Sequence, residues 1–294
     1  MTSPLSEIAG LPRPKDDELD LFGITHQGHV RTSNQDHFLL CTVHPQVIVR
    51  STSLANVEHM ALRGERLATI MLVADGVGGS VDGSEASRLA TISVTEYFAS
   101  AMRCYHTVGS ASEHEFTEAL REAAIEAHNR VRTQAEAQFE GRRMASTLSV
   151  AIVVWPWLYV VQVGDSRCYT YHDGVLRQVT RDQTIAQEMV DRGALSPERA
   201  YNSPLNHVLS SAIGAEEALP VISRVDVGKR GTVTLVCSDG LTKHVSDHEI
   251  GAAISAMTSA EQLCRELLDL VLERGGSDNV TIVVGRAWPL ATPA

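Results

Sequence analysis

Residues 67–75, LATIMLVAD, form an apolar run that ends in an aspartate and is followed by Gly76. Two later stretches repeat this pattern, 158–166 (LYVVQVGDS) and 234–240 (TLVCSDG). Apolar β-type segments bounded by glycine and polar residues are typical of buried strands, so each aspartate is predicted to lie where a strand leaves the core. Two further aspartates, Asp36 and Asp278, stand in the polar motifs RTSNQD and SDNVT.

If these strand ends converge, their carboxylates repel one another. Two carboxylates about 4 Å apart repel by roughly 4 kcal/mol at an effective dielectric constant near 20. Such a cluster needs protons or cations, and a site of hard oxygen ligands prefers Mg²⁺ or Mn²⁺ to zinc or copper. Taken singly each motif is weak, because an Asp-Gly after a strand is more often a plain turn. The aspartates therefore predict a metal site only if they come together.

The composition limits the class of protein. The chain of 294 residues has 44% hydrophobic and 21% charged residues, which is ordinary for a globular enzyme. No apolar run approaches the roughly 20 residues that cross a bilayer, and no signal peptide is evident, so we expect a cytoplasmic protein with no membrane partner. The net charge of −11 disfavours nucleic acid as a partner, although bound cations would still permit a phosphorylated substrate. Five cysteines without a C-x-x-C pair argue against a disulfide framework and a zinc site.

At 294 residues the chain could form one large domain or two small ones, and a single domain at 19–289 is implied only by the family resemblance given below. We expect a disordered tail at 1–18, a long insertion loop at 44–66 and a short tail at 290–294. Residues 184–206 are predicted to form a helix, a turn and a second short helix.

The predicted strands fall into antiparallel blocks, and the predicted helices come in pairs. This arrangement favours sheets packed together with helices outside them. Capping boxes, in which an N-cap side chain and a residue three positions on satisfy each other's backbone donors, predict four helix starts at Asp82, Ser112, Ser246 and Ser259.

Several enzyme classes are excluded by their motifs. No cysteine is followed six positions later by arginine, so the thiolate cradle of tyrosine phosphatases is absent from the sequence. The nucleotide-binding loops GxxxxGK[ST] and GxGxxG and the nucleophile elbow GxSxG are absent as well.

Taken together, the motifs resemble those of the metal-dependent protein serine/threonine phosphatases of type 2C, in their bacterial form. The resemblance covers about residues 21–288 and implies an α+β fold: a four-layer αββα sandwich of two antiparallel sheets flanked by helices, with 184–206 as a flap beside the active site. It rests on six motifs in the correct order: Arg31-x-x-Asn34-Gln35-Asp36, Asp75-Gly76-Val77-Gly78-Gly79, Met144-Ala145-Ser146-Thr147-Leu148, Gly164-Asp165-Ser166-Arg167, Ser238-Asp239-Gly240-Leu241-Thr242 and Ser277-Asp278-Asn279-Val280-Thr281.

The resemblance implies two or three Mn²⁺ or Mg²⁺ ions as cofactors. Asp75 would bridge two of them, and the carbonyl of Gly76 would be a further ligand. Asp239 and Asp278 would complete the shell of the first ion, and Asp165 with Asp239 would hold the third. A metal-bridging hydroxide would then attack phosphorus directly, without a covalent enzyme intermediate.

The first motif supplies the remaining implied site residues. Arg31 would grip the substrate phosphate, because its planar fork suits two phosphate oxygens. Asp36 would act close to the metal ions through water. Gln35 stands where many members carry a glutamate that helps to hold the second ion, although its carbonyl oxygen can still serve as a ligand.

Three other positions depart from the family pattern. Val77 replaces a histidine proposed as general acid in eukaryotic members, Gln183 replaces a common histidine, and Lys243 replaces an acid. We predict no catalytic role for Gln183 or Lys243.

The function implied by the resemblance is hydrolysis of phosphoserine and phosphothreonine in proteins. The expected partners are phosphorylated proteins, including a cognate serine/threonine kinase, and the expected state is a monomer. Two alternatives remain open at this point. One is a catalytically weak or inactive pseudophosphatase that binds phosphoproteins. The neutral Gln35 is the residue that leaves this alternative open. The other is a metal-dependent hydrolase of small phosphoesters.

Overall fold

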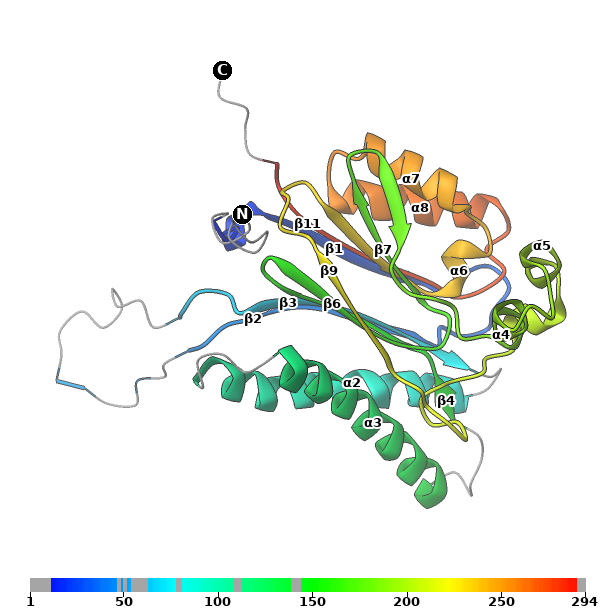
Figure 1. The fold of residues 1–294 in the computed structure, drawn as a ribbon, viewed down its shortest axis with the longest axis horizontal. Coiled ribbons are helices and arrows are strands. Elements are labelled where there is room, and N and C mark those ends of the chain that lie inside the picture. Colours follow the sequence, from blue (N-terminus) through cyan, green and yellow to red (C-terminus); the bar gives the residue numbers. More distant parts are fainter. Residues whose placement is uncertain are drawn as a thin grey trace.

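The computed structural model describes residues 12–46, 49, 52–53, 63–77, 81–107, 113–138 and 144–289. These residues form two antiparallel β-sheets stacked face to face (Figure 1). The first sheet has the order β1 (Leu19–His26), β11 (Val280–Ala287), β10 (Val233–Cys237), β7 (Arg167–His172) and β8 (Val175–Gln178). The second has the order β2 (Asp36–Val43), β3 (Ala68–Val77), β5 (Leu148–Val154), β6 (Trp157–Val163) and β9 (Val221–Asp226), and β4 (Ala145–Ser146) pairs with β3.

Helices cover the outer face of each sheet (Figure 1). The long helices α2 (Val81–Thr107) and α3 (Glu113–Gln138) pack on the second sheet, and α7 (Asp247–Ala256) and α8 (Ala260–Glu273) pack on the first. The predicted four-layer αββα sandwich is confirmed. Shorter elements complete the described chain: η1 (Asp16–Glu18), α4 (Ile185–Asp191), α5 (Pro197–Tyr201), η3 (Pro204–His207) and α6 (Asp239–Thr242).

Strand β3 shows why its sequence is a continuous apolar run. Ile70, Leu72 and Ala74 belong to the hydrophobic cluster beneath α2 and α3, whereas Met71 and Val73 belong to the cluster between the two sheets. Since successive side chains of a strand point to opposite faces, a strand buried on both faces must be apolar at every position. The run therefore fixes β3 at the centre of the sandwich.

The aspartates lie at one edge of this sandwich. Asp36 begins β2 and is paired in register with Asp75 near the end of β3. Asp165 lies in the connection from β6 to β7, Asp239 begins α6 just after β10, and Asp278 precedes β11. Antiparallel pairing brings the end of one strand beside the start of the next, so residues far apart in the sequence meet at the same rim.

The three apolar runs predicted as buried strands are confirmed as β3, β6 and β10, whereas β9 was not predicted. The predicted helix, turn and second short helix at 184–206 are confirmed as α4 and α5, and η3 is an additional element that was not predicted. The four cysteines whose side chains are described are free thiols. Within the described ranges, no helix has the length and apolar character that crossing a membrane requires.

Two of the four predicted helix caps are confirmed. Ser246 forms a complete capping box with Glu249, and the Ser259 side chain accepts a hydrogen bond from the Gln262 backbone. The prediction at Asp82 is wrong, because α2 already includes Val81 and Asp82 lies within its first turn. Ser112 lies outside the described residues.

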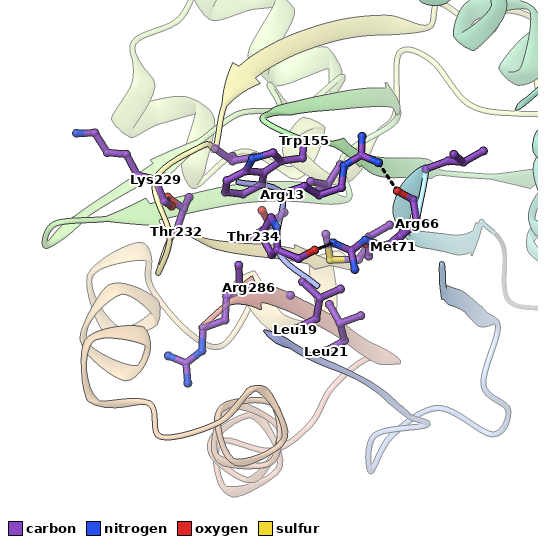
Figure 2. A pocket seen from close by; sticks show the side chains of 17 residues that line it. Arg13, Leu19, Leu21, Arg66, Met71, Trp155, Lys229, Thr232, Thr234 and Arg286 are labelled. Carbon is purple, nitrogen blue, oxygen red and sulfur yellow. Dashed lines mark hydrogen bonds between the residues drawn. The ribbon is translucent and has the colours of Figure 1, made fainter. Parts of the chain in front are cut away.

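The structure describes residues 12–18 of the predicted N-terminal tail. Residues 1–11 are outside the described range, but Asp16–Glu18 form η1, and the buried Arg66 guanidinium bonds to Asp16 (2.6 Å) and to the carbonyl of Pro14 (2.7 Å). Arg13 in turn donates to the Arg66 carbonyl. This segment lines a cavity of about 40 Å³ formed with Trp155, Met71 and the strands β1 and β11 (Figure 2).

Little of the predicted insertion loop at 44–66 can be compared with the structure, because most of it lies outside the described residues. Its described ends are joined by a bridge between Gln46 and Arg63 and by a hydrogen bond from the Gly64 N–H to the Pro45 carbonyl (2.8 Å). The loop therefore leaves and returns to the sheet at one place.

Candidate active site

Asp36 is the most buried of the clustered acids, with 4% of its surface exposed. Its Oδ2 accepts hydrogen bonds from Ser238 (2.8 Å) and Thr281 (2.7 Å), two hydroxyls from the opposite sheet. Its Oδ1 is buried and has no hydrogen-bond partner in the described part of the chain. Burial raises the pKa of Asp36 to about 6, because it disfavours the charged form more than the two hydroxyls favour it.

Asp75 faces the same space from the end of β3. Its backbone N–H donates to the Thr147 hydroxyl (3.0 Å), and its carbonyl accepts from the Thr147 N–H (2.8 Å). The pKa of Asp75 lies well above its usual range, first because of burial and then because of repulsion by Asp36 and Asp239. Asp75 thus lies at the centre of the negative charge.

The GDSR turn is held by buried side chains that carry no charge. Thr147 and Ser166 share a hydrogen bond of 2.7 Å between their hydroxyls, and Gln183 accepts from the Gly164 N–H (2.7 Å). Asp165, between Gly164 and Ser166, has its pKa raised to about 8 by burial and by repulsion from Asp239. Gln183 is therefore a positioning residue for this turn.

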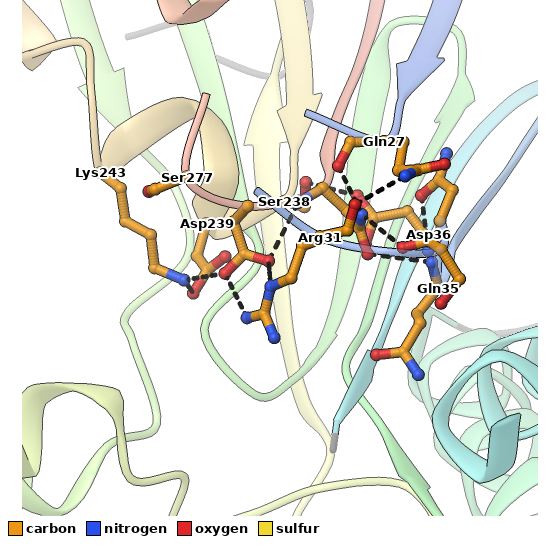
Figure 3. A network of polar contacts seen from close by, with 12 residues as sticks. Gln27, Arg31, Gln35, Asp36, Ser238, Asp239, Lys243 and Ser277 are labelled. Carbon is orange, nitrogen blue, oxygen red and sulfur yellow. Dashed lines mark hydrogen bonds and ion pairs between the residues drawn. The ribbon is translucent and has the colours of Figure 1, made fainter. Parts of the chain in front are cut away.

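Asp278 forms ion pairs with two cations, Arg31 and Lys243. Both cations are labelled in Figure 3. Arg31 donates through Nε to Oδ1 (2.6 Å) and through Nη2 to Oδ2 (2.8 Å), and Lys243 Nζ lies 2.6 Å from Oδ2. Burial alone would raise the pKa of Asp278, but these hydrogen bonds outweigh it and hold the pKa below its usual value. Arg31, with 44% of its side chain exposed, lies at the mouth of the site.

The two carboxylate oxygens of Asp239 have different surroundings. Oδ2 lies 2.6 Å from Lys243 Nζ, whereas Oδ1 is buried and has no partner among the described residues. Desolvation would lower the pKa of Lys243, but the charge of Asp239 raises it above its usual value, so the ammonium is charged at neutral pH.

Gln35 and Gly76 lie where β2 and β3 approach the start of α2. The Gln35 carbonyl accepts from Ser87 Oγ (2.5 Å) and from the Gly76 N–H (3.2 Å). A Cβ on Gly76 would lie 2.3 Å from the carbonyl oxygen of Gly83, so this position requires glycine. Because the backbone at Gly76 packs this closely against Gly83 of α2, it lies at the edge of the acidic cluster.

Asn279 joins the first motif to the last. Its Oδ1 accepts from the Gln35 N–H (2.9 Å), and its Nδ2 donates to the carbonyls of Gln27 (2.8 Å) and Ser33 (2.9 Å). The side chain is 4% exposed. Asn279 therefore fixes the loop that carries Arg31 and leads to Asp36 against the segment before β11 that carries Asp278.

The donor set fits divalent cations. It consists of carboxylate and carbonyl oxygens, and two buried carboxylate oxygens, Asp36 Oδ1 and Asp239 Oδ1, have no donor to satisfy them among the described residues. Buried polar atoms normally have a partner, and anionic oxygens without one are suited to a hard cation. In the described ranges no three His, Cys, Asp or Glu side chains form a ready-made ligand group, which agrees with the pairing of Asp278 to Arg31 and Lys243.

A cleft of about 690 Å³ opens over the acids. Its floor includes Asp165, Asp239 and Asp278, and its wall includes Tyr201 of α5 and His207 of η3. The segment predicted as a flap thus borders the cleft.

The structure brings together every site residue that the sequence predicted: Arg31, Gln35, Asp36, Asp75, Gly76, Asp165, Asp239 and Asp278 all lie at one edge of the sandwich. Sequence reasoning gave no role to Lys243, Gln183 or Asn279. The presence of Lys243 four residues after Asp239 was the available signal, because side chains spaced by four lie on one face of a helix.

Comparison with known proteins supplies a family. A family model described as protein phosphatase 2C matches residues 58–276. The serine/threonine protein phosphatase PstP of Mycobacterium tuberculosis is 32% identical over 230 residues, which are 78% of this chain but only 42% of that protein. The serine/threonine phosphatase stp of Listeria monocytogenes is 29% identical over 73% of this chain and 83% of its own length.

Solved structures agree with the fold. The crystal structure of M. tuberculosis PstP/Ppp matches with a TM-score of 0.71 and 28% identity, covering 92% of this chain and 99% of that one. A crystal structure of the PstP catalytic domain in complex with two manganese ions matches with a TM-score of 0.70 and 27% identity, covering 92% and 98%.

Proposed function

The chain belongs to the protein phosphatase 2C family, and from that premise we propose that it is a metal-dependent phosphatase that hydrolyses phosphoserine and phosphothreonine in proteins. One observation supports this most: five aspartates from separate motifs meet at one rim, and two of their buried oxygens have no donor among the described residues. The relatives named serine/threonine phosphatases and the PstP structure with two manganese ions support the same activity and the same metals.

We propose Mn²⁺ or Mg²⁺ as the cofactor, held by the acids whose charge most needs neutralisation. Asp75, the Gly76 carbonyl, Asp239 and Asp278 would hold these ions, and Asp165 with Asp239 would hold a third. When bound, the ions supply a water-derived nucleophile at neutral pH and offset charge on the phosphoryl group.

The residues of the first motif would act on substrate and water. In the metal-free protein burial raises the pKa of Asp36 to about 6. With the ions bound, Asp36 would act on water beside them. The Arg31 guanidinium donates two hydrogen bonds to the carboxylate of Asp278. A substrate phosphate group would compete with Asp278 for the same two N–H donors. The Gln35 carbonyl accepts from the Gly76 N–H, so Gln35 lies beside Gly76, where its side chain would offer the second ion a neutral amide oxygen in place of a carboxylate.

The cleft supports a protein substrate over a small phosphoester. Its volume and its border of flap residues suit an extended peptide that carries one phosphorylated side chain. We propose phosphorylated proteins, including a serine/threonine kinase, as partners, and the cytoplasm as the location, because kinases that use ATP act there. The presence of all five aspartates disfavours a binding module without activity.

One assay tests the proposal. Purified full chain would be incubated with a phosphothreonine peptide and with a small aryl phosphate, each with Mn²⁺ and with excess chelator. We expect release of phosphate from the peptide that requires Mn²⁺ and exceeds the rate on the aryl phosphate at equal concentration. If the phosphopeptide binds but is not hydrolysed with any metal ion, the protein is a phosphoprotein-binding module and not an enzyme.

A further inference from the structure

The cavity beneath the N-terminal segment lies between the two sheets, at the far end of the sandwich from the acids (Figure 2). It is lined by the start of β3, the start of β10 and the end of β11, whereas Asp75, Asp239 and Asp278 lie at the opposite ends of these strands. Much of its wall is apolar, including Leu21 and Met71. A volume of about 40 Å³ has room for about three water-sized groups, so only a small molecule fits inside it.

Two buried hydroxyls face this cavity. Side chains alternate along a strand, so Thr69 of β3 faces the same side as Met71, which belongs to the cluster between the sheets. Thr234 of β10 likewise faces the same side as Val236 of that cluster. Thr69 is 4% exposed and Thr234 is 3% exposed, and neither hydroxyl has a hydrogen-bond partner among the described residues. Since buried polar groups normally have a partner, these hydroxyls are suited to a polar ligand in the cavity.

The charged side chains around the cavity are cations. Among the described residues no acid lines it, although the chain as a whole carries a net charge of −11. Arg66 is 7% exposed and donates to Asp16 and to the Pro14 carbonyl, but its Nε–H has no acceptor in the described ranges. Arg13 and Lys229, which also line the cavity, form no ion pair within the described part of the chain. The cavity therefore favours a negatively charged ligand.

We propose that this cavity binds a short-chain monocarboxylate. Its carboxylate would accept hydrogen bonds from Arg66, Thr69 and Thr234, and its alkyl chain would pack against Leu21 and Met71. A guanidinium and two hydroxyls are donors that suit a carboxylate, and hydrogen bonds to a charged group are the stronger ones. The apolar wall offers no partner to a second charged group, so a dicarboxylate or a phosphate would bury an unpaired charge at high cost. The volume limits the ligand to about two to four carbons.

Met71 provides a direct probe of the cavity. Its side chain is 1% exposed and lines the wall, and its methyl group can be labelled with carbon-13 through methionine. Full chain in buffer containing Mg²⁺ would be titrated with propionate while the methionine methyl signals are followed by NMR, with Met71→Leu identifying the signal of Met71. We expect a saturable shift of this signal with a Kd on the order of 1 mM, the range open to a ligand of this size.

Matched ligands test the chemical class. Propionamide has the shape of propionate without its charge, and malonate adds a second carboxylate to a chain of the same length. Both should bind about tenfold or more weakly than propionate, because propionamide lacks the charge-assisted hydrogen bonds and malonate places a charge against the apolar wall.

Isosteric variants test where the carboxylate lies. Thr69→Val and Thr234→Val each remove one hydroxyl and keep the shape of the side chain, and each should weaken propionate binding about tenfold. The matched control is Thr170→Val. Thr170 of β7 is paired in register with Thr234 and is buried as well, but it is not part of the cavity wall, so this variant should keep the wild-type Kd. Urea denaturation would confirm that each variant is folded.

Each contrary result overturns a stated part of the proposal. No shift of the Met71 signal up to about 50 mM propionate would leave a cavity that holds water alone. Equal affinities for propionate and propionamide would exclude a carboxylate as the ligand class. Equal Kd values for Thr170→Val and both lining variants would remove the carboxylate from the two hydroxyls. The site is separate from the acidic cluster, so none of these results bears on the metal-dependent phosphatase, which has its own assay.

Discussion

Replacing Asn279 by alanine tests how the site is held together. The substitution removes three hydrogen bonds, of 2.9, 2.8 and 2.9 Å, that join β11 to the loop of the first motif. The backbone N–H of Gln35 is then left buried without its acceptor, which costs about 1–3 kcal/mol. The carbonyls of Gln27 and Ser33 each lose a bond worth about 1 kcal/mol, which water can partly replace. We expect the free energy of unfolding to fall by about 2–4 kcal/mol.

Urea denaturation of the metal-free protein measures this change, with an unaltered slope showing that the denatured state is unchanged. The matched control is Asn202→Ala, which removes one exposed hydrogen bond to the Glu198 carbonyl and should cost less than about 0.5 kcal/mol. Because the loop also carries Arg31 and Asp36, Mn²⁺ should bind Asn279→Ala more weakly than wild type. A loss of stability no larger than that of the control would refute the assignment of Asn279 as the link between the two motifs.

Three further predictions concern the cluster itself. Gln35→Glu should lower the Mn²⁺ concentration that half-saturates the protein in a metal titration, since it adds a carboxylate beside the second ion; an unchanged titration would argue against any role for Gln35. In metal-free protein the raised pKa values of Asp36 (about 6) and Asp165 (about 8) mean that the folded state binds these protons more tightly than the unfolded chain does. The stability that these two groups contribute is therefore full below about pH 4 and is lost as the pH rises through 6 and 8, by on the order of 3 kcal/mol for Asp36. Thermal melts from pH 5 to 8 should show this loss, with Asp165→Asn removing its upper part and saturating Mn²⁺ suppressing it; equal slopes in wild type and variant would contradict the cause. Gly76→Ala should cost about 1–3 kcal/mol in urea denaturation because its Cβ meets the backbone of Gly83, and a neutral result would show that α2 can shift.

Most strands could be predicted from the sequence because burial on one or both faces imposes a pattern. β3 and β10 are buried at nearly every position, and their apolar runs are unmistakable. β9 was missed because it lies at the edge of its sheet with largely exposed or half-buried residues, so no apolar period marks it. The cap at Asp82 was misplaced for a different reason. The sequence pattern of a capping box also occurs one residue inside a helix, and only the backbone conformation distinguishes an N-cap residue from a residue of the first turn.

The positions of the aspartates could also be predicted, since strand ends meet at a rim. The partners of those aspartates could not. Arg31 reaches Asp278 across 247 positions of sequence, and Asp36 finds the hydroxyls of Ser238 and Thr281 on the other sheet. These contacts depend on how the two sheets are stacked, which no local pattern encodes.

Mn²⁺-dependent hydrolysis of a phosphothreonine peptide by wild type and by Asp239→Asn tests the central claim most directly. The substitution keeps the shape of a side chain whose buried Oδ1 is assigned to a cation, and removes its charge. We predict a loss of kcat/KM on the order of 100-fold or more at any Mn²⁺ concentration. Asp17→Asn, an exposed aspartate of η1, should keep the wild-type rate. Equal, metal-dependent rates for wild type and Asp239→Asn would contradict the claim that these aspartates form the catalytic metal site.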